Sequence, residues 1–140
     1  MKRYKISVII PVFNNEDTIN LIYNRLKKVF KKIKYNYQII FIDDFSEDNS
    51  YKKIKQICVF DKNVTSLKLT KNFGQRFATM AGLKYASGDY VMNLDADLQD
   101  PPEILEKISK AISSKKTELI IAVRKSVDEK IFRKITSYIQ

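Results

Sequence analysis

Residues 90–103 read Tyr-Val-Met-Asn-Leu-Asp-Ala-Asp-Leu-Gln-Asp-Pro-Pro-Glu, which combines a strand, an acidic loop and the start of a helix. The short apolar run from Tyr90 to Leu94 predicts a buried strand that ends at Asp95. A helix is predicted next, because Asp100 can cap it, a proline holds its first position and a glutamate lies three residues after the cap. We expect this helix to continue to Ser113.

The same alternation occurs along the whole chain. Other short apolar runs predict strands at residues 5–11, 37–42, 64–69 and 119–123, and helices are predicted at 16–34, 47–58, 74–86 and from 127 onward. Ser46 is the expected cap of the second helix, and Gly88 the expected stop after the third. This order predicts an α/β fold in which helices cover both faces of a mostly parallel sheet, in one domain of residues 1–140.

The composition limits the chemistry. Without a histidine, these 140 residues cannot form a Ser-His-Asp triad or a histidine-ligated zinc site. The single cysteine, Cys58, permits no internal disulfide and is expected to be a small core residue. No glycine-rich phosphate loop follows the first strand, so bound phosphates need another positive charge. Oxygen ligands remain available, and these suit Mg²⁺ or Mn²⁺.

The net charge of +10 favours anionic partners such as nucleotides or phospholipid headgroups. Five lysines between Lys27 and Lys34 are either a solvated helix face or a surface directed toward a membrane. No apolar run approaches the ~18 residues of a membrane span. We therefore expect a cytoplasmic chain, in peripheral contact with the inner face of the cell membrane, and leave open whether it is a homo-oligomer. Nucleic acid is not an expected partner, because stacking aromatics are not interleaved with the basic residues.

Polar clusters follow each of the first four predicted strands, where parallel sheets bind ligands. They are residues 11–16, 43–48, 72–75 and 95–100. In a 3-2-1-4 strand order, the loop at Pro11 and the loop at Asp95 would share one crevice. Asp97 could then hold a divalent cation against bound phosphates.

The acidic residues have different expected roles. Asp43, Asp95 and Asp97 are expected ligands, since an unpartnered carboxylate at a buried strand end is costly. Asp100 is expected mainly to cap a helix, whereas Asp44 and Asp48 are either ligands or loop and capping residues. Arg124 closes the fifth predicted strand and could pair with phosphate, or lie on the surface.

Together, four motifs resemble family 2 glycosyltransferases with the A-type, Rossmann-like fold. They are Pro11-Val12-Phe13-Asn14-Asn15-Glu16, Asp43-Asp44-x-Ser46-x-Asp48, Asn72-Phe73-Gly74-Gln75 and Asp95-Ala96-Asp97-Leu98-Gln99-Asp100-Pro101-Pro102-Glu103. The last motif resembles the branch that transfers a sugar to a polyprenyl phosphate, as in dolichol-phosphate mannose synthase and bactoprenol glucosyltransferases. That branch often has glutamate where Asn15 stands, with Glu16 one place later.

The resemblance implies a UDP- or GDP-linked sugar donor, a lipid-phosphate acceptor and an inverting transfer. It implies a nucleoside pocket at Pro11 and Phe13, with Asn15 and Glu16 in the same loop, and a contact of Asp43 with the base. It also implies that Asp95 contacts the ribose and joins Asp97 and Gln99 at the metal, that Arg124 reaches the diphosphate, and that Arg133 approaches the acceptor phosphate.

Members of this branch continue beyond the point that corresponds to Gln140, so the resemblance is to a shortened fold that contains the donor half. The main alternative is therefore a nucleotide-sugar binder without catalysis. A phosphoacceptor receiver domain is disfavoured, because its paired acids would follow the first strand, where Pro11 and Asn14 stand.

Overall fold

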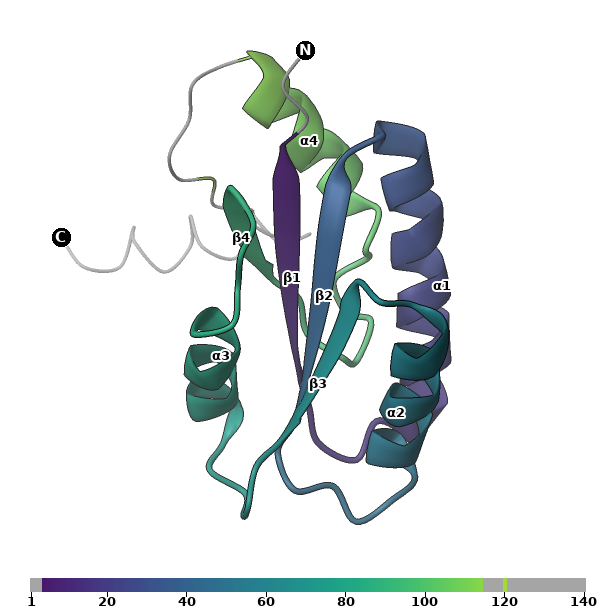
Figure 1. Ribbon diagram of the computed structural model, residues 1–140, viewed down its shortest axis with the longest axis vertical. Coiled ribbons are helices and arrows are strands. Elements are labelled where there is room, and N and C mark those ends of the chain that lie inside the picture. Colours follow the sequence, from purple (N-terminus) through teal and green to yellow (C-terminus); the bar gives the residue numbers. More distant parts are fainter. Residues whose placement is uncertain (1–3, 115–119, 121–140) are drawn as a thin grey trace, which may run out of the picture.

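The computed structural model describes residues 4–114 and 120, within which four parallel strands form one sheet (Figure 1). The elements are β1 (Lys5–Val12), α1 (Glu16–Ile33), β2 (Asn36–Asp43), α2 (Ser50–Phe60), β3 (Val64–Lys68), α3 (Gln75–Leu83), β4 (Tyr90–Asn93) and α4 (Ile104–Ser114). The strand order is β3-β2-β1-β4, with every pair parallel. The predicted α/β class is confirmed, and the observed order is the 3-2-1-4 arrangement in which the Pro11 and Asp95 loops would share one crevice.

Strand β1 lies inside the sheet, between β2 and β4. Every residue from Ile6 to Val12 is buried, as expected for a strand that has a neighbour on each side and a helix layer on each face. Val12 aligns with Asp43 of β2, and the amide of Leu94 continues the pairing with β4 by donating to the carbonyl of Ile9. The loops after β1, β2 and β4 therefore leave the sheet at the same edge.

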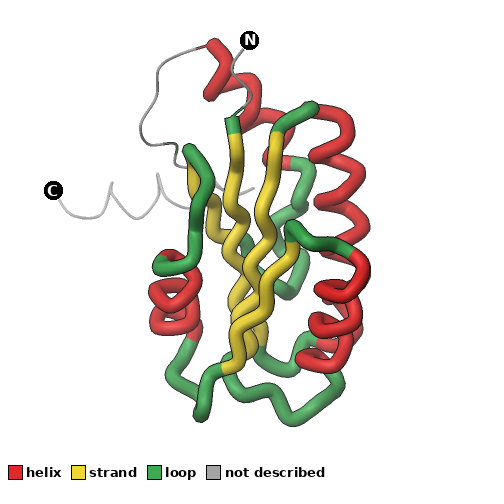
Figure 2. The backbone as a smooth tube through the Cα atoms, viewed as in Figure 1, coloured by secondary structure: helices red, strands yellow, loops and turns green. Residues whose placement is uncertain are grey.

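The helices form two layers around the sheet, so the expected three-layer architecture is confirmed. One core packs α1, α2 and α4 against side chains such as Val8 and Phe41. The other core packs Ala78 of α3 against Ile9 and Ile42. Figure 2 shows α3 by itself on one side of the strands, with α1 and α2 on the other.

Two glycines allow close packing around α3. A Cβ atom at Gly82 would lie 2.6 Å from Ile9 Cγ2 and 2.7 Å from Ile42 Cδ1, so α3 rests almost directly on the sheet. A Cβ atom at Gly88 would lie 2.6 Å from the backbone nitrogen of Ser7. The prediction that Gly88 stops the helix is wrong: α3 ends at Leu83, and Gly88 lets the chain pass close to β1.

Two predicted helix starts are also wrong. Ser46 does not cap α2, which begins at Ser50; its hydroxyl accepts a hydrogen bond from the amide of Asn14 instead. Helix α4 begins at Ile104, later than the cap expected at Asp100 would place it. Glu103 forms an ion pair with Arg25 of α1. Both helices thus begin three residues later than the predicted starts at residues 47 and 101.

Asp61, at the end of α2, joins three elements of the fold. Its carboxylate accepts hydrogen bonds from Tyr23 at 3.0 Å, Lys27 at 2.8 Å and Tyr37 at 2.7 Å. Burial alone would raise the pKa of Asp61, but these bonds and one from the amide of Asn63 lower it to about 2. The charged carboxylate thereby fixes α1 to β2 and to the turn before β3.

Several predictions concern residues that the structure does not describe. They are the fifth strand apart from Ile120, the helix from Val127, and the roles of Arg124 and Arg133. Ile120 packs against the core that α1, α2 and α4 share. None of the helices in residues 4–114 is long and apolar enough to cross a membrane.

Candidate functional site

A pocket of about 210 Å³ lies beyond the carboxyl ends of the strands. Its lining residues are Pro11, Val12, Phe13, Asn15, Asp44, Gln75, Asp95, Ala96 and Asp97. The loops after β1 and β4 thus share one crevice at the point where strand order reverses, which is where open α/β sheets bind ligands. This juxtaposition follows from the strand order.

The loop after β1 is fixed by hydrogen bonds to the loop after β2 and to the first residue of α2. The amide of Asn14 donates to the Ser46 hydroxyl at 3.0 Å, and the amide of Asn15 donates to the Ser50 hydroxyl at 2.9 Å. Asn14 adopts a left-handed conformation, with φ of 53°. Together these contacts keep the ring of Phe13 at the pocket, where it is 47% exposed and can stack on a flat ligand.

Glu16, although expected at the site, does not line this pocket. Its carboxylate accepts a hydrogen bond at 2.8 Å from the amide of Asn49, while its own amide donates to Asp48 at 3.0 Å. Burial alone would raise the pKa of Asp48, but hydrogen bonds from Ser50 and from the amide of Glu16 lower it below its ordinary value. Glu16 and Asp48 therefore join the starts of α1 and α2.

Two adjacent carboxylates at the end of β2 have different environments. Asp44 accepts hydrogen bonds from the amides of Phe73 and Gly74, both at 2.8 Å, and so fixes the loop that leads into α3. Asp43 is fully buried, and neither of its carboxylate oxygens has a hydrogen-bond partner among the described residues. Lys68 Nζ lies 3.9 Å from Asp43 Oδ2. Asp44 lines the pocket, whereas Asp43 does not.

Asp95 has a partner that the sequence motifs did not assign. Gln75, the first residue of α3, donates a hydrogen bond from its side-chain amide to Asp95 Oδ1. Gln75 follows β3 and Asp95 follows β4, which are the two outer strands of the described sheet. Both side chains nevertheless line the same pocket. The motif that contains Gln75 marked this loop, but only the fold brings the residue to Asp95.

Two hydrogen bonds fix the Asp95–Asp97 loop, one at Ala96 and one at Asp97. The Thr18 hydroxyl, on the first turn of α1, contacts the carbonyl oxygen of Ala96 at 2.6 Å. Asp97 Oδ1 accepts a hydrogen bond at 2.9 Å from the amide of Gln99, across Leu98, whose φ is 62°. Ala96 is buried while the side chain of Asp97 is exposed beside the pocket. The loop thus places the exposed Asp97 carboxylate at the pocket.

The donor set suits a metal that is shared with a bound phosphate. Within residues 4–114, no three Asp, Glu, His or Cys side chains converge to form a complete metal cage. Mg²⁺ is commonly held by one or two carboxylates together with substrate phosphates. Asp95 and Asp97 supply such a pair at the pocket, and Gln99 follows in the same loop without lining it.

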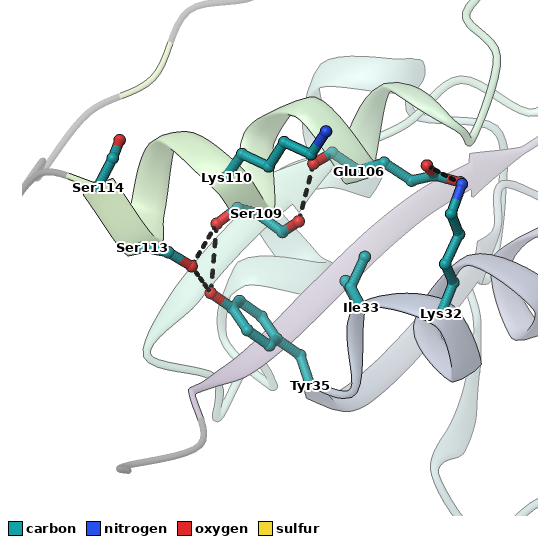
Figure 3. A pocket seen from close by; sticks show the side chains of 8 residues that line it. All are labelled: Lys32, Ile33, Tyr35, Glu106, Ser109, Lys110, Ser113 and Ser114. Carbon is teal, nitrogen blue, oxygen red and sulfur yellow. Dashed lines mark hydrogen bonds and ion pairs between the residues drawn. The ribbon is translucent and has the colours of Figure 1, made fainter.

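A second pocket, of about 600 Å³, lies between the C-terminal end of α1 and the length of α4 (Figure 3). Lys32 pairs with Glu106 across it, and the Tyr35 hydroxyl contacts Ser113 Oγ at 2.6 Å. Helix C-termini carry partial negative charge, which basic side chains offset. Lys32 lies in the last turn of α1, where it offsets this charge, and the pocket contains none of the four motifs.

Comparison with known proteins agrees with the motifs. The family model "Glycosyl transferase family 2" matches residues 7–139. The uncharacterized glycosyltransferase YkcC of Bacillus subtilis (strain 168) is 40% identical over 133 residues, which are 94% of this chain and 41% of that protein. An undecaprenyl-phosphate 4-deoxy-4-formamido-L-arabinose transferase of Proteus mirabilis (strain HI4320) is 37% identical over 95% of this chain and 41% of its own length. This chain spans about two fifths of these curated relatives.

Solved structures share the fold. S. aureus TarS 1-349 in complex with UDP superposes with a TM-score of 0.67 at 24% identity, over 89% of this chain and 37% of that one. The mannosyltransferase PcManGT from Pyrobaculum calidifontis, in complex with GDP-Man and Mn²⁺, gives a TM-score of 0.61 at 22% identity, over 79% of this chain and 32% of that one. The chain therefore belongs to glycosyl transferase family 2 and has the A-type glycosyltransferase fold.

Proposed function

We propose that this chain binds a nucleotide-diphospho-sugar together with Mg²⁺ or Mn²⁺ and takes part in transferring the sugar to a polyprenyl phosphate. The observation that carries the proposal is the pocket between the Pro11–Asn15 loop and the Asp95–Asp97 loop. Support for the acceptor comes from the Proteus mirabilis relative, which is named for undecaprenyl phosphate. Support for the donor and metal comes from structural neighbours with bound UDP, or with GDP-Man and Mn²⁺.

The proposed residue roles follow the lining of the pocket. The nucleoside would lie against Pro11 and Phe13, with Asn15 beside them. Asp43 is the proposed partner of the base, because its buried carboxylate lacks a hydrogen-bond partner among the described residues. A small movement of the lining is required, since Asp43 is fully buried.

The diphosphate would lie toward the acidic loop. Asp97 and Asp95 are the proposed metal ligands, Asp95 also reaches the ribose, and Gln99 completes the set from the same loop. A divalent cation bound there would neutralise negative charge that builds on the leaving diphosphate. Arg124 is proposed at the diphosphate and Arg133 at the acceptor phosphate.

The transfer itself needs no protein base. An acceptor phosphate oxygen, already anionic, attacks the anomeric carbon of the sugar. A bond forms between that oxygen and the carbon, the bond from the carbon to the donor diphosphate breaks, and the nucleoside diphosphate leaves with the electron pair. Attack opposite the leaving group inverts the anomeric centre. This route agrees with a sequence that contains no histidine.

A second candidate function is nucleotide-sugar binding without transfer. It is favoured by one observation: the pocket in the described residues is lined by the residues proposed for the donor and the metal, and none of its lining residues is proposed for the acceptor. The two candidates share the pocket and the metal, and differ only in whether a sugar reaches the acceptor.

Labelled sugar transfer tests the proposal. The chain is incubated with Mn²⁺, detergent-solubilised undecaprenyl phosphate and radiolabelled UDP-glucose or GDP-mannose, and label is measured in the lipid phase. Labelled lipid supports transfer by this chain. Nucleotide binding without labelled lipid supports the second candidate, and absence of nucleotide binding contradicts both.

A further inference from the structure

The outward side of α3 exposes large apolar side chains. Met80 is 64% exposed and Phe77 61% exposed. We use the name α3 face for the exposed side chains Phe73, Arg76, Phe77, Met80, Leu83 and Lys84. Large exposed apolar patches mark surfaces that contact a partner or a membrane.

Helix geometry puts these side chains on one stripe. Arg76 and Phe77 lie four and three residues before Met80, and Leu83 lies three residues after it, which is the spacing of one helix face. Phe73 and Lys84 flank the helix at its two ends. The opposite side, with Ala78 and Gly82, is buried against the sheet. Among the described helices, α3 alone lies on its side of the strands (Figure 1). The side of α3 opposite Ala78 and Gly82 therefore faces away from the sheet. The α3 face therefore contributes nothing to the described core.

The positive charge of this surface indicates which kind of partner it binds. Residues 71–85 contain Lys71, Arg76 and Lys84 but no aspartate or glutamate. Protein–protein interfaces also favour Phe, Met and Arg but are depleted in lysine, whereas surfaces that bind anionic membranes combine aromatic and aliphatic side chains with both lysine and arginine. Lys71 Nζ already lies 5.0 Å from the centre of the Phe73 ring. The mixture on the α3 face fits anionic lipid.

The basic helix α1 fits this role less well. Three of its cations are paired with carboxylates: Arg25 with Glu103, Lys27 with Asp61 and Lys32 with Glu106. Among its large apolar side chains, only Leu21 is exposed. The lysines between Lys27 and Lys34 thus form a partly neutralised, mainly polar surface.

We propose that the α3 face docks the chain onto an anionic phospholipid bilayer. The position of the helix supports this, because Gln75, its first residue, lines the pocket and bonds Asp95. A bilayer in contact with Phe73 and Phe77 would therefore lie beside the pocket mouth. The inference rests on the proposed function in one respect, since a lipid-phosphate acceptor must reach that mouth from a membrane.

Vesicle co-sedimentation tests the docking. The chain is mixed with vesicles of pure phosphatidylcholine or of phosphatidylcholine with phosphatidylglycerol, and the bound fraction is measured. We expect binding only to the anionic vesicles. Arg76→Glu should weaken it roughly tenfold or more, because each basic residue at such a surface contributes about a fivefold factor. Lys31→Glu makes the same charge change on exposed α1 and should alter binding less than about twofold.

Met80→Glu tests the apolar part of the surface and should also abolish vesicle binding. Because Met80 does not line the pocket, calorimetric titration of this variant with UDP or GDP and Mn²⁺, without vesicles, should match the wild type. That titration separates the two proposals, since nucleotide binding does not require docking. The inference is overturned if the wild type does not bind anionic vesicles or if Met80→Glu still binds them. It is also overturned if Arg76→Glu and Lys31→Glu weaken vesicle binding equally. It is also overturned if wild type is a dimer that Met80→Glu converts to a monomer.

Discussion

Thr18 connects the two loops that form the pocket. Its hydroxyl lies 2.6 Å from the carbonyl oxygen of Ala96 and 3.1 Å from that of Asn15. Ala96 stands between Asp95 and Asp97, so the position of both carboxylates depends on this contact. Thr18 was not among the residues expected at the site, because a threonine in the first turn of a helix usually serves only that helix.

Replacing Thr18 with valine should weaken metal-dependent nucleotide binding by about fivefold, the value of one ordinary hydrogen bond. Valine keeps the shape of the side chain but cannot donate to Ala96. Thr18→Ser, which keeps the hydroxyl, should bind like wild type. The measurement is a calorimetric titration with UDP or GDP, with and without Mn²⁺. A loss of equal size with and without Mn²⁺ would show that Thr18 does not act through the acidic loop.

Single residues also show where sequence reasoning stops. Asp43 and Asp44 are adjacent, and nothing in their spacing reveals their different environments. Asp44 holds the loop before α3, whereas Asp43 accepts no hydrogen bond among the described residues and has Lys68 Nζ at 3.9 Å. Glu16 was expected at the site and instead bonds the amide of Asn49. Gln75 reaches Asp95 only through the packing of α3 on the sheet. The direction of a side chain depends on tertiary contacts, and local patterns in a single sequence do not reveal these contacts.

At the scale of elements, the close packing of α3 on the sheet depends on Gly82. Gly82→Ala would place a Cβ atom 2.6 Å from Ile9 Cγ2 and 2.7 Å from Ile42 Cδ1. We expect the free energy of unfolding to fall by about 1–3 kcal/mol, as for other overpacked cores. Urea denaturation measures the change, and Ile42→Val in the same chain should recover part of it by removing Cδ1. If Gly82→Ala is as stable as wild type, α3 is not seated this closely.

The Asp61 cluster predicts a dependence of stability on pH. The folded-state pKa of Asp61 is about 2, below its ordinary value of 3.8, so the stabilisation is present above about pH 4 and lost as pH falls toward 2. Its size is about 2 kcal/mol. Urea denaturation at pH 6 and near pH 2.5 should show this loss in wild type. Asp61→Asn should show a smaller dependence on pH, and an identical dependence would contradict the assignment.

The helix starts explain why local signals predicted elements better than their ends. Apolar spacing identified α1, because burial of one helix face depends on spacing alone, whereas capping residues indicated α2 and α4. Ser46 and Asp100 satisfied local capping preferences, yet α2 begins at Ser50 and α4 at Ile104. The Ser46 hydroxyl accepts from Asn14 instead, a contact between distant segments that local preference does not include.

For the whole molecule, the sequence predicted the topology well. Alternating strands and helices with connections of this length allow few arrangements, because crossovers between parallel strands are right-handed. The 3-2-1-4 order then brings the Pro11 and Asp95 loops together without any further information. The α3 face could not be predicted, because its apolar residues would fit a helix buried in the core equally well.

The central claim is that a nucleotide diphosphate and a divalent cation bind together at Asp95 and Asp97. Calorimetric titration of the chain with UDP and with GDP, with and without Mn²⁺, tests it most directly, using Asp97→Asn and the matched variant Asp17→Asn. Asp17 is exposed in the first turn of α1 and does not line the pocket. We expect one nucleotide to bind in a Mn²⁺-dependent way, Asp97→Asn to abolish that dependence and Asp17→Asn to preserve it. If neither UDP nor GDP binds, or if Asp97→Asn keeps the Mn²⁺ dependence of nucleotide binding, the account is contradicted.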